Sequence, residues 1–270
     1  MSAIPIPSQA ESLEESERQA VEVLRPELEK HLSLVRDYIN LIGNAAVSIP
    51  PQPLTNIPKA LVVSSLLLAR LSNDLRCLLL VAERGYPLQA LTLAASIYEI
   101  GITIASIGGD NVQAQKWFEH DKPERPFLKN LHKATREVFK NCGIPEFEVQ
   151  AQGDYRVYQQ FCMGKHGNPL LQSGHGIVPA GKDVNVRSGP DTSELAVNNL
   201  WYAMAYSARY SYISVYAFTT YHVPTAQQDY IQKLADVLGA RREQLQAIAR
   251  KRWGTTDPFQ GLWRNHTAGG

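Results

Sequence analysis

Apolar residues recur every three or four positions along most of the chain, the spacing that gathers them on one face of a helix. Leu24, Leu28 and Leu32 are one example. Prolines and glycines interrupt the pattern, and no segment alternates apolar and polar residues clearly enough to predict a strand. The sequence therefore predicts an all-α protein. The predicted helices cover residues 11–43, 58–84, 88–107, 111–120, 127–141, 152–163, 192–222 and 226–253.

The connections between these helices differ in length. Gly85 and Pro87 leave a very short turn between the helices over 58–84 and 88–107, which predicts an antiparallel hairpin. Residues 164–190, by contrast, contain six glycines and three prolines. This segment is predicted to be a long loop, of the kind that is usually functional or disordered. We expect a disordered tail over 1–10, one helical domain over 11–253 and a flexible tail over 254–270.

Composition excludes several protein classes. With 44% apolar and 20% charged residues, the chain is not collagen-like, fully disordered or a coiled coil. Its net charge of +1 gives no strong overall attraction to nucleic acid or to an anionic membrane. The cysteines, at positions 77, 142 and 162, have neither disulfide-framework nor zinc-site spacing, and the N-terminus lacks the features of a signal peptide. These features predict a cytoplasmic protein.

The segment Leu88 to Gly108 is apolar and long enough to cross a bilayer, with Glu99 as its single charge. It also carries several hydroxyl side chains, and it lacks the basic or aromatic flanks that mark a membrane interface. We therefore predict a buried core helix and no membrane association.

Known cofactor and metal motifs are missing from the sequence. Gly176, Gly181 and Lys182 have the spacing of a phosphate-binding P-loop, but Asp183 stands where that motif needs a magnesium-binding hydroxyl. Metalloprotease, nucleophile-elbow and dinucleotide-binding motifs do not occur, and the histidines lack metal-site spacing. We predict neither a cofactor nor a metal.

Glu99 is the first candidate site residue. Thr92, Ser96, Glu99, Thr103 and Ser106 follow one another at intervals of four and three, which places them on one face of an otherwise apolar helix. A carboxylate on such a helix needs a partner, because burying it alone is costly. The row predicts either a polar groove centred on Glu99 or an internal ion pair, for which Arg70 and Arg76 of the preceding helix are candidates.

The segment from Tyr155 to His166 contains the other candidates. Arg156, Lys165 and His166 gather around a predicted helix end, where an imidazole can titrate near neutral pH. In one interpretation His166 is a general acid or base, with Arg156 or Lys165 stabilising a developing phosphorane charge and Glu99 orienting one of them. In the other, His166 caps the helix or binds a loop carbonyl.

The last two predicted helices carry aromatic and basic residues. The helix over 192–222 holds six tyrosines with Arg209 among them, a set that either packs between helices, stacks on bases or lines a small-molecule pocket. The final helix is rich in arginine, including Arg241, Arg242 and Arg252. These side chains either contact RNA phosphates, offset the partial negative charge at the C-terminal end of their own helix, or pair with the acidic first helix.

The order of these features resembles the DUF5677 family of HEPN-like helical proteins. The resemblance covers about residues 58–170 and rests on the glycine turn at Gly85, the Tyr98–Glu99 step, and a later segment from Tyr155 to His166 and Gly167. It implies a HEPN-like helical bundle, here with additional N- and C-terminal helices. It also implies a homodimer, and a protein of a toxin–antitoxin or antiphage defence system.

Many HEPN-like proteins cleave RNA without a metal, so the resemblance implies metal-independent RNA cleavage if this protein is an enzyme. In that case we assign Glu99, Arg156, Lys165 and His166 as its catalytic residues. The usual ribonuclease signature of that group, an arginine followed four to six residues later by a histidine, is matched by Arg25 to His31 and by Arg125 to His132. About one match is expected by chance, so these two carry no signal. A proline also follows each of the two arginines, where the family usually has a polar residue.

The alternative hypothesis is a non-catalytic module for protein interaction or regulation. It predicts that Glu99 forms a structural ion pair, whereas the enzyme hypothesis predicts that Glu99, Arg156 and His166 converge on an open groove.

Overall fold

The computed structural model describes residues 12–53, 56–121, 127–180, 183–186 and 188–254. Helices make up most of these residues, which confirms the predicted all-α class. The helices are α1 (Leu13–Val47), α2 (Lys59–Glu83), α3 (Pro87–Ile107), α4 (Asn111–Phe118), α5 (Leu131–Asn141), α6 (Phe147–Lys165), α7 (Pro169–Gly176), α8 (Glu194–His222) and α9 (Thr225–Trp253), and two short strands are β1 (Ile177–Ala180) and β2 (Asp183–Val186).

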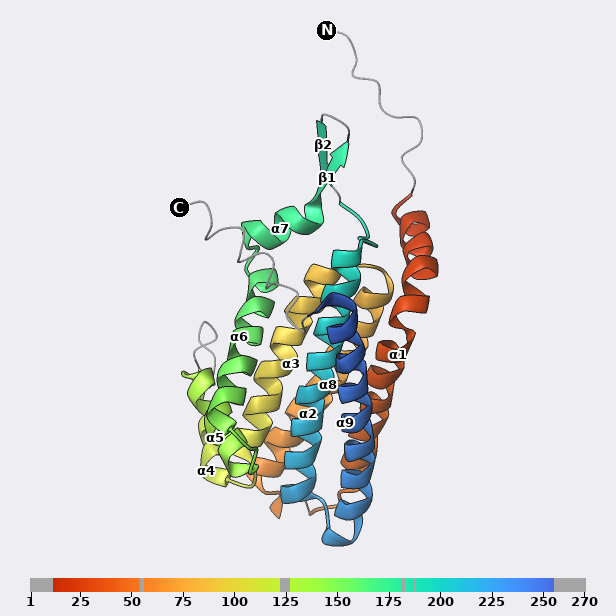
Figure 1. Ribbon diagram of the computed structural model, residues 1–270. Coiled ribbons are helices and arrows are strands. Elements are labelled where there is room, and N and C mark those ends of the chain that lie inside the picture. Colours follow the sequence, from red (N-terminus) through yellow and green to blue (C-terminus); the bar gives the residue numbers. More distant parts are fainter. Residues whose placement is uncertain (1–11, 54–55, 122–126, 181–182, 187, 255–270) are drawn as a thin grey trace.

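The long helices run side by side as a bundle, with α3 among α2, α6 and α8 (Figure 1). The sequence explains this position, because Glu99 is the only charged residue of α3 and most of the helix is buried. The helix α1 packs against α2, α8 and α9, while α5 packs against α3 and α6. The short turn at Gly85 joins α2 and α3 as a packed pair, as the sequence predicts.

The helix α3 is long and apolar enough to span a membrane by length and composition, and it is the one described helix that passes this test. However, 67% of its most apolar stretch is buried inside the protein. The structure therefore agrees with the prediction of a core helix. The predicted tails over 1–10 and 254–270 lie outside the described residues, apart from Gly254.

Most predicted helices occur at their predicted places, but three boundaries were wrong by four or five residues. The helix α1 continues past Gly43 to Val47, α5 begins at Leu131 rather than at residue 127, and α6 begins at Phe147 rather than at residue 152. Gly43 lies on the exposed side of α1, where it costs some helix stability without breaking the helix. Ser193 caps α8 by accepting a hydrogen bond from the backbone of Ala196, which the capping sequence predicts.

The prediction of a structureless loop over 164–190 was also wrong. This segment contains the end of α6, the helix α7 and the antiparallel hairpin β1–β2. It is fastened to α8 through His175, whose Nδ1 lies 2.7 Å from Oδ2 of Asp191 and whose Nε2 lies 2.7 Å from the amide nitrogen of Asn199. All three side chains are buried. Because both ring nitrogens are engaged in the interior, His175 links this segment to Asp191 and to α8.

Candidate functional site

The carboxylate of Glu99 is half-buried and is bound by α6. The hydroxyl of Tyr158 donates to Oε1 of Glu99 at 2.7 Å, and Nζ of Lys165 lies 3.6 Å from the same atom. The prediction that Arg70 or Arg76 of α2 pairs with Glu99 was wrong. The helix α6 packs against α3, and its side chains Tyr158 and Lys165 contact the carboxylate instead. Arg70 instead lies 3.9 Å from Asp74, one turn along its own helix.

Aromatic packing fixes the position of the Tyr158 hydroxyl. The ring of Tyr158 stacks on Tyr98 of α3, with ring centroids 4.8 Å apart, and on Tyr155 of its own helix, with centroids 5.9 Å apart. Burial raises the pKa of Tyr158 well above its ordinary value, and its hydrogen bonds with Cys162 and Glu99 raise it further. The hydroxyl therefore stays protonated and acts as a fixed donor to Glu99.

The predicted polar row on α3 faces an open pocket, which we call the Glu99 pocket, with a cavity volume of about 440 Å³. Ser96, Glu99 and Thr103 lie on its wall beside aromatic residues of α4 and the following segment. The hydroxyl of Ser96 donates to Asp74 at 2.7 Å, and that of Thr103 donates to the backbone oxygen of Glu99, also at 2.7 Å. The polar atoms of this row are thus largely satisfied by the protein itself.

The structure brings together only part of the predicted catalytic set. Lys165 contacts Glu99, whereas Arg156 lies nine positions earlier on α6, on the opposite side of the helix, and lines a different pocket. His166 is exposed at the C-terminal end of α6, where its backbone N–H donates to the carbonyl of Cys162 at 2.9 Å. Its position agrees with the helix-end interpretation. Glu99, Arg156 and His166 therefore do not converge on one groove.

The first of the two ribonuclease-signature matches, Arg25 to His31, forms no site for RNA. His31 is 1% exposed in the core, out of reach of an RNA strand. Arg125, of the second match, lies outside the described residues.

The tyrosines of α8 follow the interhelical packing prediction in part. Tyr202 and Tyr210 are buried, and the hydroxyl of Tyr210 donates to Oδ2 of Asp154 on α6 at 2.7 Å. Tyr216 and Tyr221 are exposed. Arginines of α9 pair with α1 as one interpretation predicts, through Arg241 and Asp37 at 2.6 Å in the middle of the helix and through Arg252 and Glu27 at 2.5 Å near its end.

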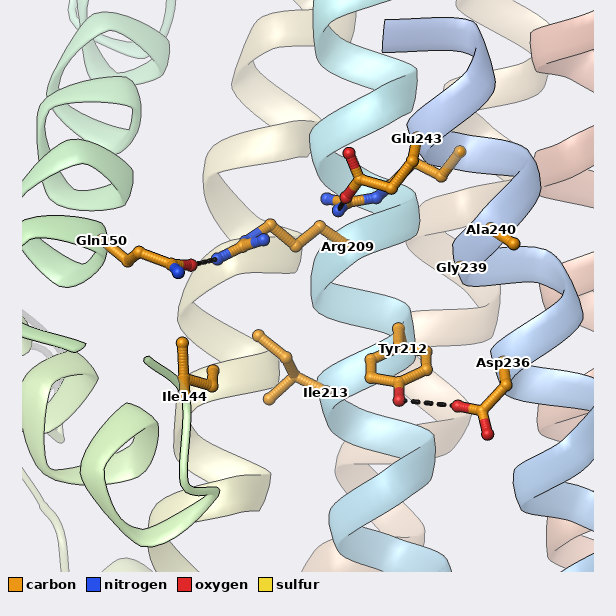
Figure 2. A pocket seen from close by; sticks show the side chains of 10 residues that line it. Ile144, Gln150, Arg209, Tyr212, Ile213, Asp236, Gly239, Ala240 and Glu243 are labelled. Carbon is orange, nitrogen blue, oxygen red and sulfur yellow. Dashed lines mark hydrogen bonds and ion pairs between the residues drawn. The ribbon is translucent and has the colours of Figure 1, made fainter. Parts of the chain in front are cut away.

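A second opening, which we call the arginine groove, lies between α6, α8 and α9. It consists of two adjoining pockets of about 350 and 360 Å³ that share Gln150, Arg209 and Arg242 (Figure 2 shows the first). The apolar half is completed by Ile144, Tyr212, Ile213, Asp236, Gly239, Ala240 and Glu243. The polar half is completed by Gly153, Asp154, Arg156, Val157, Gln160, Tyr202, Tyr206 and Gln246.

Several side chains of the arginine groove are held in place before any ligand binds. Nε of Arg209 donates to Asp154 at 2.7 Å, and Nη2 donates to Gln150 at 3.3 Å, the bond drawn in Figure 2. Burial lowers the pKa of Arg209, but the charge of Asp154, its hydrogen bond to Arg209 and the neighbouring tyrosines together outweigh burial, so the net shift is upward and the guanidinium stays charged. On the other wall, the hydroxyl of Tyr212 donates to Asp236 at 2.9 Å, and burial with this bond raises its pKa to about 12.

Arg242 has an unusual environment for a cation. The residue is only 6% exposed, yet it lines both halves of the arginine groove. Its Nη2 binds the neighbouring Glu243, whose own side chain is 55% exposed. Its Nη1 is buried and has no hydrogen-bond partner among the described residues. A buried guanidinium N–H without an acceptor is costly and uncommon in folded proteins.

The sequence pattern placed Arg209 among the tyrosines of one predicted helix and Arg242 among the arginines of the last one. It did not predict the groove that the two side chains line together. A signal was present for Arg242, because it occupies the apolar stripe of α9 with Ile231, Ala235 and Leu245, at intervals of four, seven and three residues. An arginine in such a stripe indicates either a buried ion pair or a site for an anion.

No group of three or more histidine, cysteine, aspartate or glutamate side chains suitable for a metal occurs in the described part of the chain.

In the comparisons with known proteins, the chain matches no family model, no curated protein and no solved structure. The resemblance to the DUF5677 family therefore stays a prediction.

Proposed function

We propose that this protein is a non-catalytic regulatory module that binds a small molecule in the arginine groove. The observation that carries the proposal is the groove itself, an opening of ligand-pocket size whose polar side chains are already positioned by Asp154, Gln150 and Asp236. Pockets that bind small molecules are typically concave, mostly apolar and furnished with a few fixed polar groups. Preorganised groups favour binding because little conformational entropy is lost when the ligand arrives.

The separation of the predicted catalytic residues favours this reading over an enzyme. A general acid must reach the reacting group together with the charge-stabilising residue. Arg156 and Lys165 lie on opposite sides of α6, and Glu99 is engaged with Tyr158 and Lys165 in a link between α3 and α6. Glu99→Ala is accordingly expected to destabilise the fold.

A thermal-shift screen tests the binding proposal. The purified protein is screened against small phosphates, carboxylates, amines and sugars, and hits are repeated with Ala240→Trp and Ala247→Trp. Ala240 lines the groove, so its replacement by Trp is expected to fill the apolar half and abolish the thermal shift. Ala247 is exposed elsewhere on the same helix and serves as the matched control. The proposal fails when no compound stabilises the protein, or when Ala240→Trp leaves every shift intact.

A second candidate function is metal-independent RNA cleavage, which the contact between Glu99 and Lys165 directly before His166 favours. Wild type and His166→Ala are incubated with total RNA and tRNA in EDTA and compared on a gel. The leading proposal expects no cleavage by either protein. Cleavage by the wild type alone, with an unchanged melting temperature for the variant, would instead place His166 in a ribonuclease site.

A HEPN-like fold of the DUF5677 type, a homodimeric state and a role in defence complete the proposal, and all three rest on the resemblance. A cytoplasmic location is supported by the spacing of the cysteines and by the burial of α3. Protein or RNA partners would be the targets of the regulation.

A further inference from the structure

The polar half of the arginine groove carries excess positive charge. Arg156, Arg209 and Arg242 line it, and Asp154 is the one carboxylate among the described residues of its lining. Glu243, which binds Nη2 of Arg242, lines the other half. With Glu243 counted, the three arginines face two carboxylates, which leaves one net positive charge and favours an anionic ligand such as a phosphate monoester.

The three arginines differ in what they can offer a ligand. Arg209 is neutralised by Asp154, and Arg156 is exposed and pairs with no carboxylate among the residues that the structure describes. Arg242 supplies a buried N–H that lacks an acceptor. This N–H is shielded in the free protein, so the Arg242 side chain must shift for a bound phosphate oxygen to satisfy it, in a setting where water screens the charge poorly. Planar guanidinium groups also match the geometry of phosphate oxygens better than a lysine ammonium does.

The apolar half suits a flat, largely apolar body. Ile144, Tyr212 and Ile213 lie on its wall, and Gly239 keeps the space beside the Tyr212 ring free of a side chain, because a methyl group there would contact the ring at 3.6 Å. The carboxylate of Asp236 lies at the same end. It repels a second phosphate there and can accept hydrogen bonds from hydroxyl or amino groups.

The geometry points to a ligand with one phosphate monoester, held by Arg156 and Arg242, and an aromatic body with hydroxyl or amino groups, held beside Tyr212. A nucleoside monophosphate has this chemistry. The inference deepens the proposed function and rests on it, because it names the class of small molecule that the regulatory groove binds.

Calorimetric titration with AMP, adenosine and inorganic phosphate tests the inference. AMP is expected to bind at least about tenfold more tightly than either adenosine or inorganic phosphate, since only AMP fills both halves. Arg156→Ala and Arg242→Gln are each expected to weaken AMP binding about tenfold while leaving adenosine binding unchanged. Arg76→Ala, an exposed arginine on α2, is the matched control and is expected to bind AMP like the wild type.

Circular dichroism shows whether Arg242→Gln folds. Should it not fold, Arg156→Ala still tests the inference, because Arg156 is exposed and its replacement does not disturb the core. Equal binding of AMP and adenosine, with both blocked by Ala240→Trp, would overturn the phosphate inference and leave the small-molecule proposal standing. Unchanged AMP binding by Arg156→Ala would likewise overturn it. Absence of binding by AMP and inorganic phosphate would overturn the inference, and the screen above then decides separately whether the groove binds another class of compound.

Discussion

At the scale of single residues, the interior of this bundle contains several polar groups whose burial the apolar periodicity of the sequence does not predict. His31 lies on the buried face of α1 against Trp201, with ring centroids 4.3 Å apart, and its Nδ1 has no partner among the described residues. Burial lowers the pKa of His31 from 6.5 to about 3, and the nearby Arg241 lowers it further. The imidazole is therefore neutral in the folded protein at physiological pH.

The depressed pKa of His31 predicts loss of stability in acid. Below pH 6.5 the unfolded chain takes up a proton at this position, whereas the folded protein does not until about pH 3. The free energy of unfolding should therefore fall by up to about 1.4 kcal/mol per pH unit across this window. His31→Phe keeps a ring against Trp201 and removes the titration. Urea unfolding near neutrality and at mildly acidic pH should show a smaller acid loss for the variant, and equal losses would contradict the assignment.

The sequence could identify Glu99 as a residue in need of a partner, because one carboxylate stood alone in an apolar helix. It could not identify Tyr158 and Lys165 as the partners. Which helix covers a given face depends on how the whole bundle packs, and periodicity within one helix carries no such information. The same reason separates Arg156 from the other predicted site residues, since a rotation of half a turn about α6 decides which groove a side chain enters.

At the scale of elements, helices with strong apolar periodicity were predictable and the segment after α6 was not. The predicted ranges for α2, α3, α8 and α9 agree with the structure to within about two residues, the usual uncertainty at helix ends. The helix α7 contains one proline and two glycines, and β1 and β2 have only four residues each, so local propensity favours neither element strongly. Contacts distant in the sequence hold α7 in place, through His175 with Asp191 and Asn199.

Breaking the His175 contacts should loosen this segment without unfolding the bundle. His175→Ala leaves the buried carboxylate of Asp191 and the amide of Asn199 without the imidazole between them. We expect amide hydrogen exchange to accelerate over residues 169–180, while the amides of α2 and α3 keep their protection. His166→Ala removes an exposed imidazole and is the control. Equal protection of residues 169–180 in wild type and His175→Ala would show that other contacts hold the segment.

At the scale of the whole molecule, the end of α9 fastens three helices together. The guanidinium of Arg252 binds Glu194 at the start of α8, at 2.8 Å, and Glu27 of α1, at 2.5 Å. The indole of Trp253 donates to the same Glu194 at 2.8 Å. Pairing between the basic last helix and the acidic first helix was predictable from composition. The arginine groove was not predictable, because it depends on the spacing of α6 from α8 and α9, which no local sequence pattern encodes.

The position of α1 also has a consequence for biosynthesis. Its apolar stripe is covered by α2, α8 and α9, and the last two emerge from the ribosome long after α1. The hairpin of α2 and α3 can form early from neighbouring sequence, but at about 5–20 residues per second α1 waits on the order of ten seconds for α8. During that interval Leu24, Leu28 and Leu32 are only partly covered. Nascent chains stalled before α8 would therefore present a ready binding surface to molecular chaperones.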